Sequence, residues 1–252
     1  MKNYIRILNI SILNVSLNEL LGDLEEGVLL TPNVDHLIKL QRDKAFYTLY
    51  QNNKWTICDS KIVCLALKFL RTPVKEVIPG SSFFSKYYTF HKDNPEVRIF
   101  LLGAKEGVAR IAKDRINTQV GREIIVGEYS PPFNLENDAK EVEKIIEMVN
   151  RSGATVLVVG MGAPKQEKWI YAYKKHMPGV RLFMALGATI DFEAGVLKRA
   201  PSLFQKLYME WLYRLMAEPK RLWKRYLVDD FPFIFLIIKQ KLGIYKDPFK
   251  QK

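Results

Sequence analysis

The pattern of apolar and polar positions divides most of this chain into two kinds of segment, which alternate. Short apolar runs recur six times, and most are followed by a stretch with the apolar spacing of a helix. These runs occupy residues 28–30, 55–58, 97–102, 123–126, 155–159 and 180–186. Near-continuous apolar runs are typical of strands that are buried on both faces. We therefore expect an α/β fold, with a mainly parallel sheet flanked by helices.

The two ends of the chain show other patterns. Residues 1–13 alternate apolar and polar positions, which predicts an opening strand or hairpin and not the apolar core of a signal peptide. Ser16 then favours the start of a helix that runs to about Leu24. Near the other end, the longest apolar run covers 231–238 and contains Pro232, and it is far shorter than the roughly 20 residues of a membrane span. We expect the protein to touch a membrane without crossing it.

Composition and charge divide the chain into two parts. It has 252 residues, is 48% hydrophobic and carries a formal net charge of +12, which suits one large domain with an appendage. Residues 202–252 hold 11 Lys and Arg against 5 Asp and Glu, so this segment carries +6, half of the total. We predict an α/β catalytic domain at 1–201 and a basic, amphipathic, helical, membrane-associating appendage at 202–252.

The same composition limits the partners and the compartment. Nucleic acid would be attracted to the positive charge, but no zinc spacing, basic zipper or RNA-binding aromatic motif is present, so we expect none to bind. Cys58 and Cys64 are too few to staple a secreted fold and favour a reducing, cytoplasmic compartment. The three histidines share no ligand spacing, and we predict neither a metal nor another cofactor.

Candidate functional residues come directly after the predicted strands. A Rossmann-like sheet binds ligands beyond the carboxyl ends of its strands, so this is where we expect a site. Thr31 and Asn33 come directly after the run at 28–30. A hydroxyl and an amide at this position can bond a sugar or a nucleotide, although both residues are also common helix N-caps. Asp59 closes the run at 55–58 and fits either a general base or the cap of the next helix.

A glycine-containing segment follows the strongest strand pattern, TVLVV. Gly160 and Gly162 would let backbone amides approach a diphosphate, and Gln166 can bond a base or a sugar. The full dinucleotide fingerprint is absent, because Pro164 and Lys165 occupy its middle. This weakens the alternative of a dinucleotide-dependent oxidoreductase.

Three arginines mark the appendage. Arg214, Arg221 and Arg225 are spaced seven and four residues apart, so a helical path would bring them to one side. Arginine binds phosphate through a rigid planar fork, and neighbouring tryptophans and tyrosines suit a membrane surface. A phosphate-bearing, lipid-linked substrate is one interpretation, and a solvated basic face of a terminal helix is the other.

In order along the chain, these motifs resemble those of the WecG/TagA/CpsF family of bacterial glycosyltransferases. The resemblance covers about residues 7–226, and the matching segments are TPNVDH at 31–36, Asp59, FLLGAKEGVA at 100–109, GMGAPKQEKWI at 160–170, GATIDFEAG at 187–195, RAP at 199–201 and EWLYRLMAEPKRLWKRY at 210–226. The resemblance implies transfer of a sugar from a UDP-sugar to a polyprenyl-diphosphate-linked saccharide at the cytoplasmic membrane face. It also implies inversion and no obligatory metal.

By position, the resemblance assigns roles to the residues singled out above. Asp59 would be the general base, Thr31, Asn33 and Gln166 would line the donor and acceptor pocket, and the arginines would engage diphosphate. The family usually has an Arg-Val pair after the Asp59 helix, where this chain has Glu76 and Val77. If Glu76 faced the pocket it would repel an acidic sugar, which favours a neutral N-acetylhexosamine or hexose, as in an N-acetylmannosaminyltransferase.

Two further possibilities stay open at the level of sequence. A non-catalytic scaffold that binds nucleotide sugars at a membrane surface would keep the same basic appendage. The appendage also carries an apolar stripe, which would pair subunits into a homo-oligomer if neither membrane nor core covers it. The stripe consists of Phe204, Leu207, Tyr208, Trp211 and Leu215.

Overall fold

The computed structural model describes residues 3–51, 53–132, 135, 138–198, 200, 201, 204 and 210–250. Its main element is a six-stranded, wholly parallel sheet in the order β4-β3-β8-β7-β5-β6. The strands are β3 (Gly27–Leu30), β4 (Trp55–Thr56), β5 (Ile99–Gly103), β6 (Ile125–Tyr129), β7 (Val156–Gly160) and β8 (Leu182–Ala185). All six apolar runs therefore contribute strands, and the predicted Rossmann-like α/β fold is confirmed.

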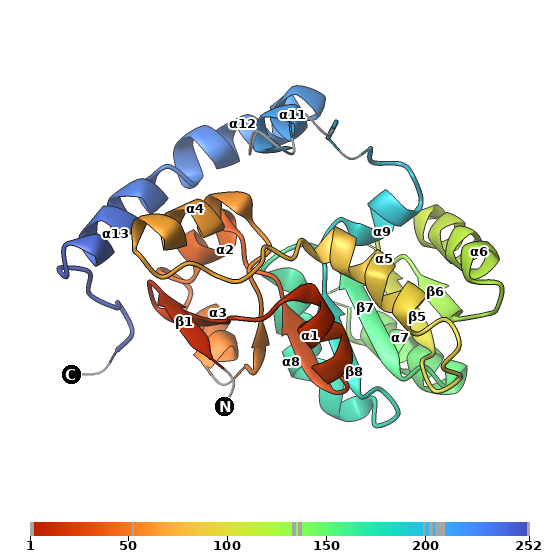
Figure 1. Cartoon of the computed structure of the whole chain (residues 1–252). Helices are drawn as coiled ribbons and strands as arrows, with labels where there is room; N and C mark the ends of the chain where they lie inside the picture. Colours follow the sequence, from red (N-terminus) through yellow and green to blue (C-terminus); the bar gives the residue numbers. More distant parts are fainter. Residues whose placement is uncertain are drawn as a thin grey trace.

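Helices cover both faces of this sheet (Figure 1). One layer contains α1 (Leu17–Asp23), α5 (Gly80–Phe90), α6 (Val108–Val120) and α9 (Thr189–Glu193). The other contains α2 (Val34–Lys39), α3 (Lys44–Gln51), α4 (Lys61–Phe69), α7 (Ala139–Ser152) and α8 (Lys165–Tyr173), which continues into the 3-10 turn η2 (Lys174–His176). Along β5, Ile99 and Leu101 pack in the apolar cluster under the first helix layer, and Phe100 and Leu102 pack in the cluster under the second. Successive side chains of a strand point to opposite faces of the sheet.

The predicted N-terminal hairpin and the helix that follows it are also confirmed. An antiparallel hairpin pairs β1 (Tyr4–Ile7) with β2 (Ile10–Leu13). Ser16 caps α1 through a capping box with Glu19, in which each side chain accepts from the backbone N–H of the other residue.

Residues 210–241 form a helical arm, drawn in blue in Figure 1, which lies over α2 and α4. It consists of α11 (Glu210–Ala217), α12 (Pro219–Lys224), a π-helical turn η3 (Arg225–Asp229) and α13 (Pro232–Lys241). Phe233 and Ile237 of α13 are buried in the same apolar cluster as α2. The helical C-terminal segment is thus present, and its last helix packs in the same apolar core as α2 and the sheet. The boundary between 201 and 202 stays a prediction.

Within the described ranges, no helix combines the length and the hydropathy that crossing a bilayer requires.

Candidate active site

The carboxyl ends of four strands lie next to one another at one edge of the sheet. Leu30 pairs with both Thr56 and Ala185, and Val159 also pairs with Ala185. The residues that follow β3, β4, β7 and β8 are therefore neighbours, although they are far apart in the sequence. Thr31 joins two of these ends, because its hydroxyl donates to the Ala185 carbonyl at 3.2 Å.

Asn33 caps the helix that follows β3. Its Oδ1 accepts from the backbone N–H of His36 at 3.3 Å, in an extended backbone conformation that is typical of an N-cap. The capping role that the sequence allowed is therefore observed. The same oxygen also accepts from Nη2 of Arg225 at 3.4 Å, so the cap lies in contact with the arm.

Asp59 lies three residues beyond β4, at the next strand end. Its Oδ1 accepts from the backbone N–H of Gly80, the first residue of α5, at 2.6 Å. Ser60, and not Asp59, caps α4 by accepting from the Val63 N–H at 3.5 Å. The interpretation of Asp59 as the cap of α4 is therefore wrong. Its carboxylate is instead oriented by α5 and is partly exposed at the strand end.

The residue before Asp59 is chemically quiet. Burial raises the pKa of the Cys58 thiol to about 12, with smaller contributions from Cys64 and Asp59. A thiol with this pKa is protonated at neutral pH and is a poor nucleophile. The Cys58 thiol is therefore not a candidate nucleophile at this strand end.

Two glycine loops, 160–163 after β7 and 186–188 after β8, touch each other at the centre of the edge. A Cβ on Gly160 would lie 2.6 Å from the Gly187 carbonyl oxygen, so only glycine allows this approach. The N–H groups of Gly162 and Gly187 both donate to Oε1 of Gln166 at 3.1 Å. In this structure the Gly162 amide is thus engaged by Gln166, and its predicted contact with a diphosphate stays a prediction.

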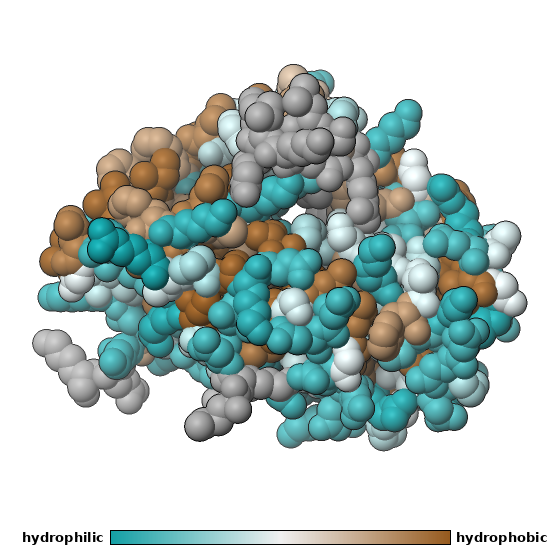
Figure 2. Space-filling model, viewed as in Figure 1, coloured by the Kyte–Doolittle hydropathy of each residue, from teal (hydrophilic) through white to brown (hydrophobic). Residues whose placement is uncertain are grey.

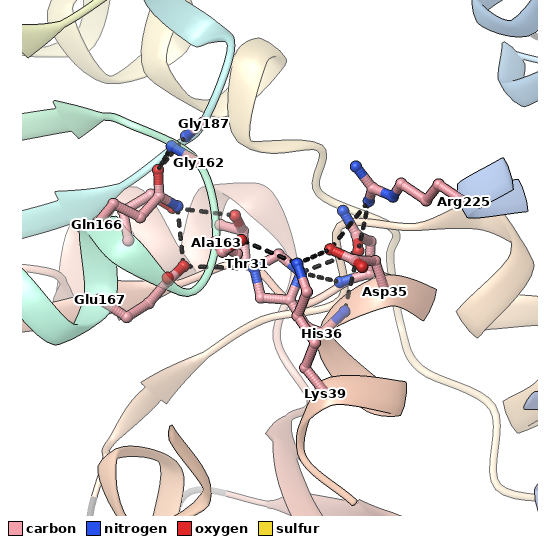
Figure 3. Close-up of polar contacts among 12 residues, drawn as sticks. Thr31, Asp35, His36, Lys39, Gly162, Ala163, Gln166, Glu167, Gly187 and Arg225 are labelled. Atoms are coloured by element: carbon pink, nitrogen blue, oxygen red, sulfur yellow. Dashed lines mark hydrogen bonds and ion pairs between the residues drawn. The ribbon is translucent and has the colours of Figure 1, made fainter. Parts of the chain in front are cut away.

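A buried polar network continues from Gln166 towards the arm (Figure 3). Gln166 is 2% exposed and donates from Nε2 to Oε1 of Glu167 at 2.8 Å. Nε2 of His36 lies 3.3 Å from the same Glu167 oxygen, and Nδ1 of His36 lies 2.9 Å from Oδ1 of Asn33. Sequence reasoning did not single out Glu167, because a glutamate in the first turn of a helix is common at the surface and gives no sign of burial.

The arm contacts two neighbouring helices of the same layer, α2 after β3 and α4 after β4. At α2, Nη2 of Arg225 lies 3.4 Å from Oδ2 of Asp35, and Nζ of Lys39 bonds the same oxygen at 2.8 Å. At α4, Glu210 at the start of α11 forms an ion pair of 4.0 Å with Lys61, two residues after Asp59.

Of the three predicted arginines, only Arg225 has a described side chain. The side chains of Arg214 and Arg221 lie outside what the structure describes, as do Leu207 and Tyr208 of the apolar stripe. The convergence of the arginines on a diphosphate therefore stays a prediction.

Glu76, where the family usually has arginine, contacts α1. Oε2 of Glu76 accepts from the Leu17 N–H at 2.7 Å, and Nζ of the neighbouring Lys75 bonds Glu19, also at 2.7 Å. The argument against an acidic donor sugar required Glu76 to face the pocket, and this contact removes its basis. Among the described residues, no group of three or more His, Cys, Asp or Glu side chains is placed to hold a metal ion.

The family model described as "Glycosyl transferase WecG/TagA/CpsF family" matches residues 5–247. The match runs from the N-terminal hairpin through all four strand ends and beyond the arm, so it includes every residue of the candidate site. The chain therefore belongs to the WecG/TagA/CpsF family of glycosyltransferases, which act in cell-surface polysaccharide synthesis.

Proposed function

We propose that this glycosyltransferase moves a sugar, with inversion, from a UDP-sugar to a saccharide carried on a polyprenyl diphosphate. The proposed donor is a UDP-N-acetylhexosamine or UDP-hexose, as for an N-acetylmannosaminyltransferase; this choice rests on the likeness to the family alone, because Glu76 contacts α1. One observation carries the proposal within the family: Asp59, the Thr31–Asn33 turn and the loops joined by Gln166 follow adjoining strands, and the basic arm contacts the helices after two of these strands, α2 and α4. Thr31, Asn33, Gln166, Gly160 and Gly162 form the proposed pocket.

The proposed reaction is a single displacement. Asp59 takes the proton of the acceptor hydroxyl as the hydroxyl oxygen attacks the anomeric carbon, and the bond from that carbon to the UDP oxygen breaks on the opposite face. Such a step needs one base and no nucleophile from the enzyme. The hydrogen bond from the Gly80 N–H holds one Asp59 oxygen, and so orients the carboxylate.

Negative charge develops on the departing diphosphate, and fixed positive charge stabilises it. We assign this role to Arg214, Arg221 and Arg225. In the present structure Arg225 contacts Asp35 and Asn33, so binding a diphosphate would require it to exchange these partners.

The arm has an exposed apolar and basic surface, which suits an acceptor that is carried on a membrane lipid. Figure 2 shows apolar residues gathered over α13, and Phe231, Ile234, Phe235 and Ile238 are each more than 40% exposed. Lys239 and Lys241 lie on the same helix, which suits an anionic membrane surface. We propose a peripheral position on the cytoplasmic face of the membrane.

The first test compares Asp59→Asn with wild type in a turnover assay. It uses a short-chain lipid-diphosphate N-acetylglucosamine acceptor and a panel of UDP-sugars, with and without EDTA. An asparagine oxygen can still accept from Gly80, so the fold and UDP affinity should persist while kcat falls about 10²–10⁴-fold. Asp138→Asn is the matched control, because it makes the same change at the N-cap of α7.

Other outcomes separate the alternatives. Turnover by Asp59→Asn within threefold of wild type would refute the role of Asp59 as base. Vesicle binding by wild type, with UDP bound but no turnover of any donor, would favour the membrane-surface scaffold. Absence of UDP binding would refute the proposed donor class.

A further inference from the structure

A buried carboxylate lies behind the glycine loops, and the proposed chemistry does not use it. Glu167 is 0% exposed. Burying a carboxylate is costly unless hydrogen bonds and an opposite charge compensate. Here Oε1 faces the Gln166 amide and the His36 ring, while Oε2 has no hydrogen-bond partner among the residues that the structure describes. Because burial of this group is unfavourable, packing alone does not explain a glutamate at this position.

The contacts of Glu167 determine the orientation of the Gln166 amide. Oε1 of Gln166 faces two N–H donors, those of Gly162 and Gly187, and Nε2 faces the Glu167 carboxylate. If the amide were rotated by 180°, its NH₂ would face two donors and its oxygen would face a carboxylate. Each of these contacts would be repulsive. Glu167 therefore selects the one orientation that joins the two loops.

His36 fixes Glu167 in turn. The His36 side chain is 8% exposed, and its ring bridges the Asn33 cap and Oε1 of Glu167. The same ring packs against Phe46 of α3, with 5.9 Å between ring centroids, which restricts its rotation. The network thus extends from α2 through α8 to both glycine loops, as Figure 3 shows.

We propose that Glu167 and His36 are positioning residues: they hold the Gln166 amide so that it joins the loops after β7 and β8, and thereby keep the nucleotide-sugar pocket in its binding shape. The link to nucleotide binding rests on the proposed function. The link to the loops depends only on the contacts described above.

The test is a double-mutant cycle of Glu167→Met and Gln166→Ala. Methionine has a similar volume but no oxygen, so Nε2 of Gln166 loses the acceptor that Glu167 provides. Hydrogen exchange followed by mass spectrometry should show faster exchange in peptides that contain Gly162 and Gly187. UDP affinity, measured by calorimetry, should fall about tenfold, the effect of one unsatisfied buried donor. In the Gln166→Ala background, Glu167→Met should add nothing to either change.

Two further variants and one control complete the design. Glu167→Gln retains an acceptor oxygen, so exchange and affinity should stay within about threefold of wild type. His36→Phe removes the contact to Glu167 from α2 and should also accelerate exchange, which provides a test if Glu167→Met does not fold. Tyr171→Phe, on the same helix, removes only the 3.0 Å bond to Asn53 and should change neither readout.

Two outcomes would overturn the positioning role: unchanged exchange at both glycine loops in folded Glu167→Met or His36→Phe, or fully additive effects in the cycle. If wild type bound no UDP while Glu167→Met still accelerated exchange, the positioning of the loops would stand and the donor assignment would fail.

Discussion

At the scale of single residues, the glycines of one short motif serve different physical purposes. Gly160 is needed because the loop after β8 approaches so closely that a Cβ would meet the Gly187 carbonyl oxygen. Gly162 has open space around it but adopts φ = 79°, where residues other than glycine are strained. Glycine is therefore required at position 160 by close packing and at position 162 by the backbone conformation.

This difference predicts unequal costs for the same substitution. Gly160→Ala forces a contact of 2.6 Å with backbone, so we expect it to lower the free energy of unfolding by about 2 kcal/mol. Gly162→Ala meets only conformational strain, of about 1 kcal/mol. Urea unfolding followed by circular dichroism measures both, and an equal or larger loss for Gly162→Ala would contradict the assignment.

Asp59 and Ser60 show what one sequence leaves undecided at this scale. Each residue type is a good N-cap, and the two are adjacent. The choice between them depends on Gly80, 21 residues later, whose N–H takes one Asp59 oxygen and leaves the cap of α4 to Ser60. No local pattern encodes this contact, because it arises from the packing of α5.

At the scale of elements, the arm docks on α2 through a partly buried group of charges. Arg225 lies between Asp35 and Asp230, at 3.4 Å and 3.9 Å, and Lys39 bonds Asp35. Burial raises the pKa of Asp230 to about 6, and this effect outweighs the opposing attraction of Arg225. At neutral pH the ionised Asp230 is therefore held in an unfavourable environment.

The shift has a definite sign. The pKa of Asp230 is higher in the folded protein than the ordinary 3.8, so its protonation stabilises the fold. This contribution is complete below about pH 4 and is lost as the pH rises through about 6. Asp230→Asn resembles the protonated form at every pH and should therefore be more stable than wild type at pH 7.5. The difference in free energy of unfolding between variant and wild type should be about 1–3 kcal/mol larger at pH 7.5 than at pH 4.5.

Urea titrations of both proteins at pH 4.5, 6.0 and 7.5 measure this difference. Asp229→Asn is the control for loss of a charge on the same turn; Asp229 is exposed and makes the smallest contribution to the raised pKa of Asp230, so this variant should change the pH dependence little. A stability difference between Asp230→Asn and wild type that does not change with pH would exclude a raised pKa.

The last helix of the arm limits how the arm can be tested. Phe233 and Ile237 are buried in the core, and the Gln240 side chain accepts from the Leu8 N–H at 2.7 Å. Deleting 202–252 would remove these contacts as well as the arginines, so lost activity would not identify the cause. Point substitutions at exposed positions of the arm avoid this problem.

At the scale of the whole molecule, one outer surface combines apolar and basic residues. Ile234 and Phe235 are 52% and 55% exposed, and Figure 2 shows that this apolar surface continues over neighbouring residues. Leu65 and Phe69 of α4 are exposed as well, and Lys241 lies 5.4 Å from the ring centroid of Phe69. The α/β layer and the arm thus both contribute to the surface that we propose meets the membrane.

Replacing two of these side chains should weaken membrane binding. The double variant Ile234→Ser, Phe235→Ser should bind vesicles of phosphatidylglycerol and phosphatidylcholine about 10–100-fold more weakly, because two large apolar side chains no longer insert. Sucrose-loaded vesicle sedimentation measures this, and higher salt should weaken wild-type binding.

Ile111→Ser is the control, since Ile111 is similarly exposed but lies on α6, away from the arm (Figure 1). Equal losses for both variants would argue against a membrane surface on the arm. A homo-oligomer in solution, detected by sedimentation velocity and abolished by the arm variant alone, would indicate subunit pairing through this surface.

The sequence by itself determined the elements of this protein. Six apolar runs became six parallel strands, and Ser16 began the helix that it predicted, because a near-continuous apolar run and a cap residue are features of the local sequence. It also placed Thr31, Asn33, Asp59 and Gln166 at strand ends, which parallel pairing then brought to one edge.

Only the tertiary structure decided what these residues contact. The burial of Glu167 beside His36, the use of the Gln166 oxygen by two loops, and the docking of Arg225 on Asp35 each join segments more than 20 residues apart. Hydrogen bonds of this kind depend on the packing of helices against the sheet. The sequence pattern of each segment carries no record of the distance at which another segment will lie.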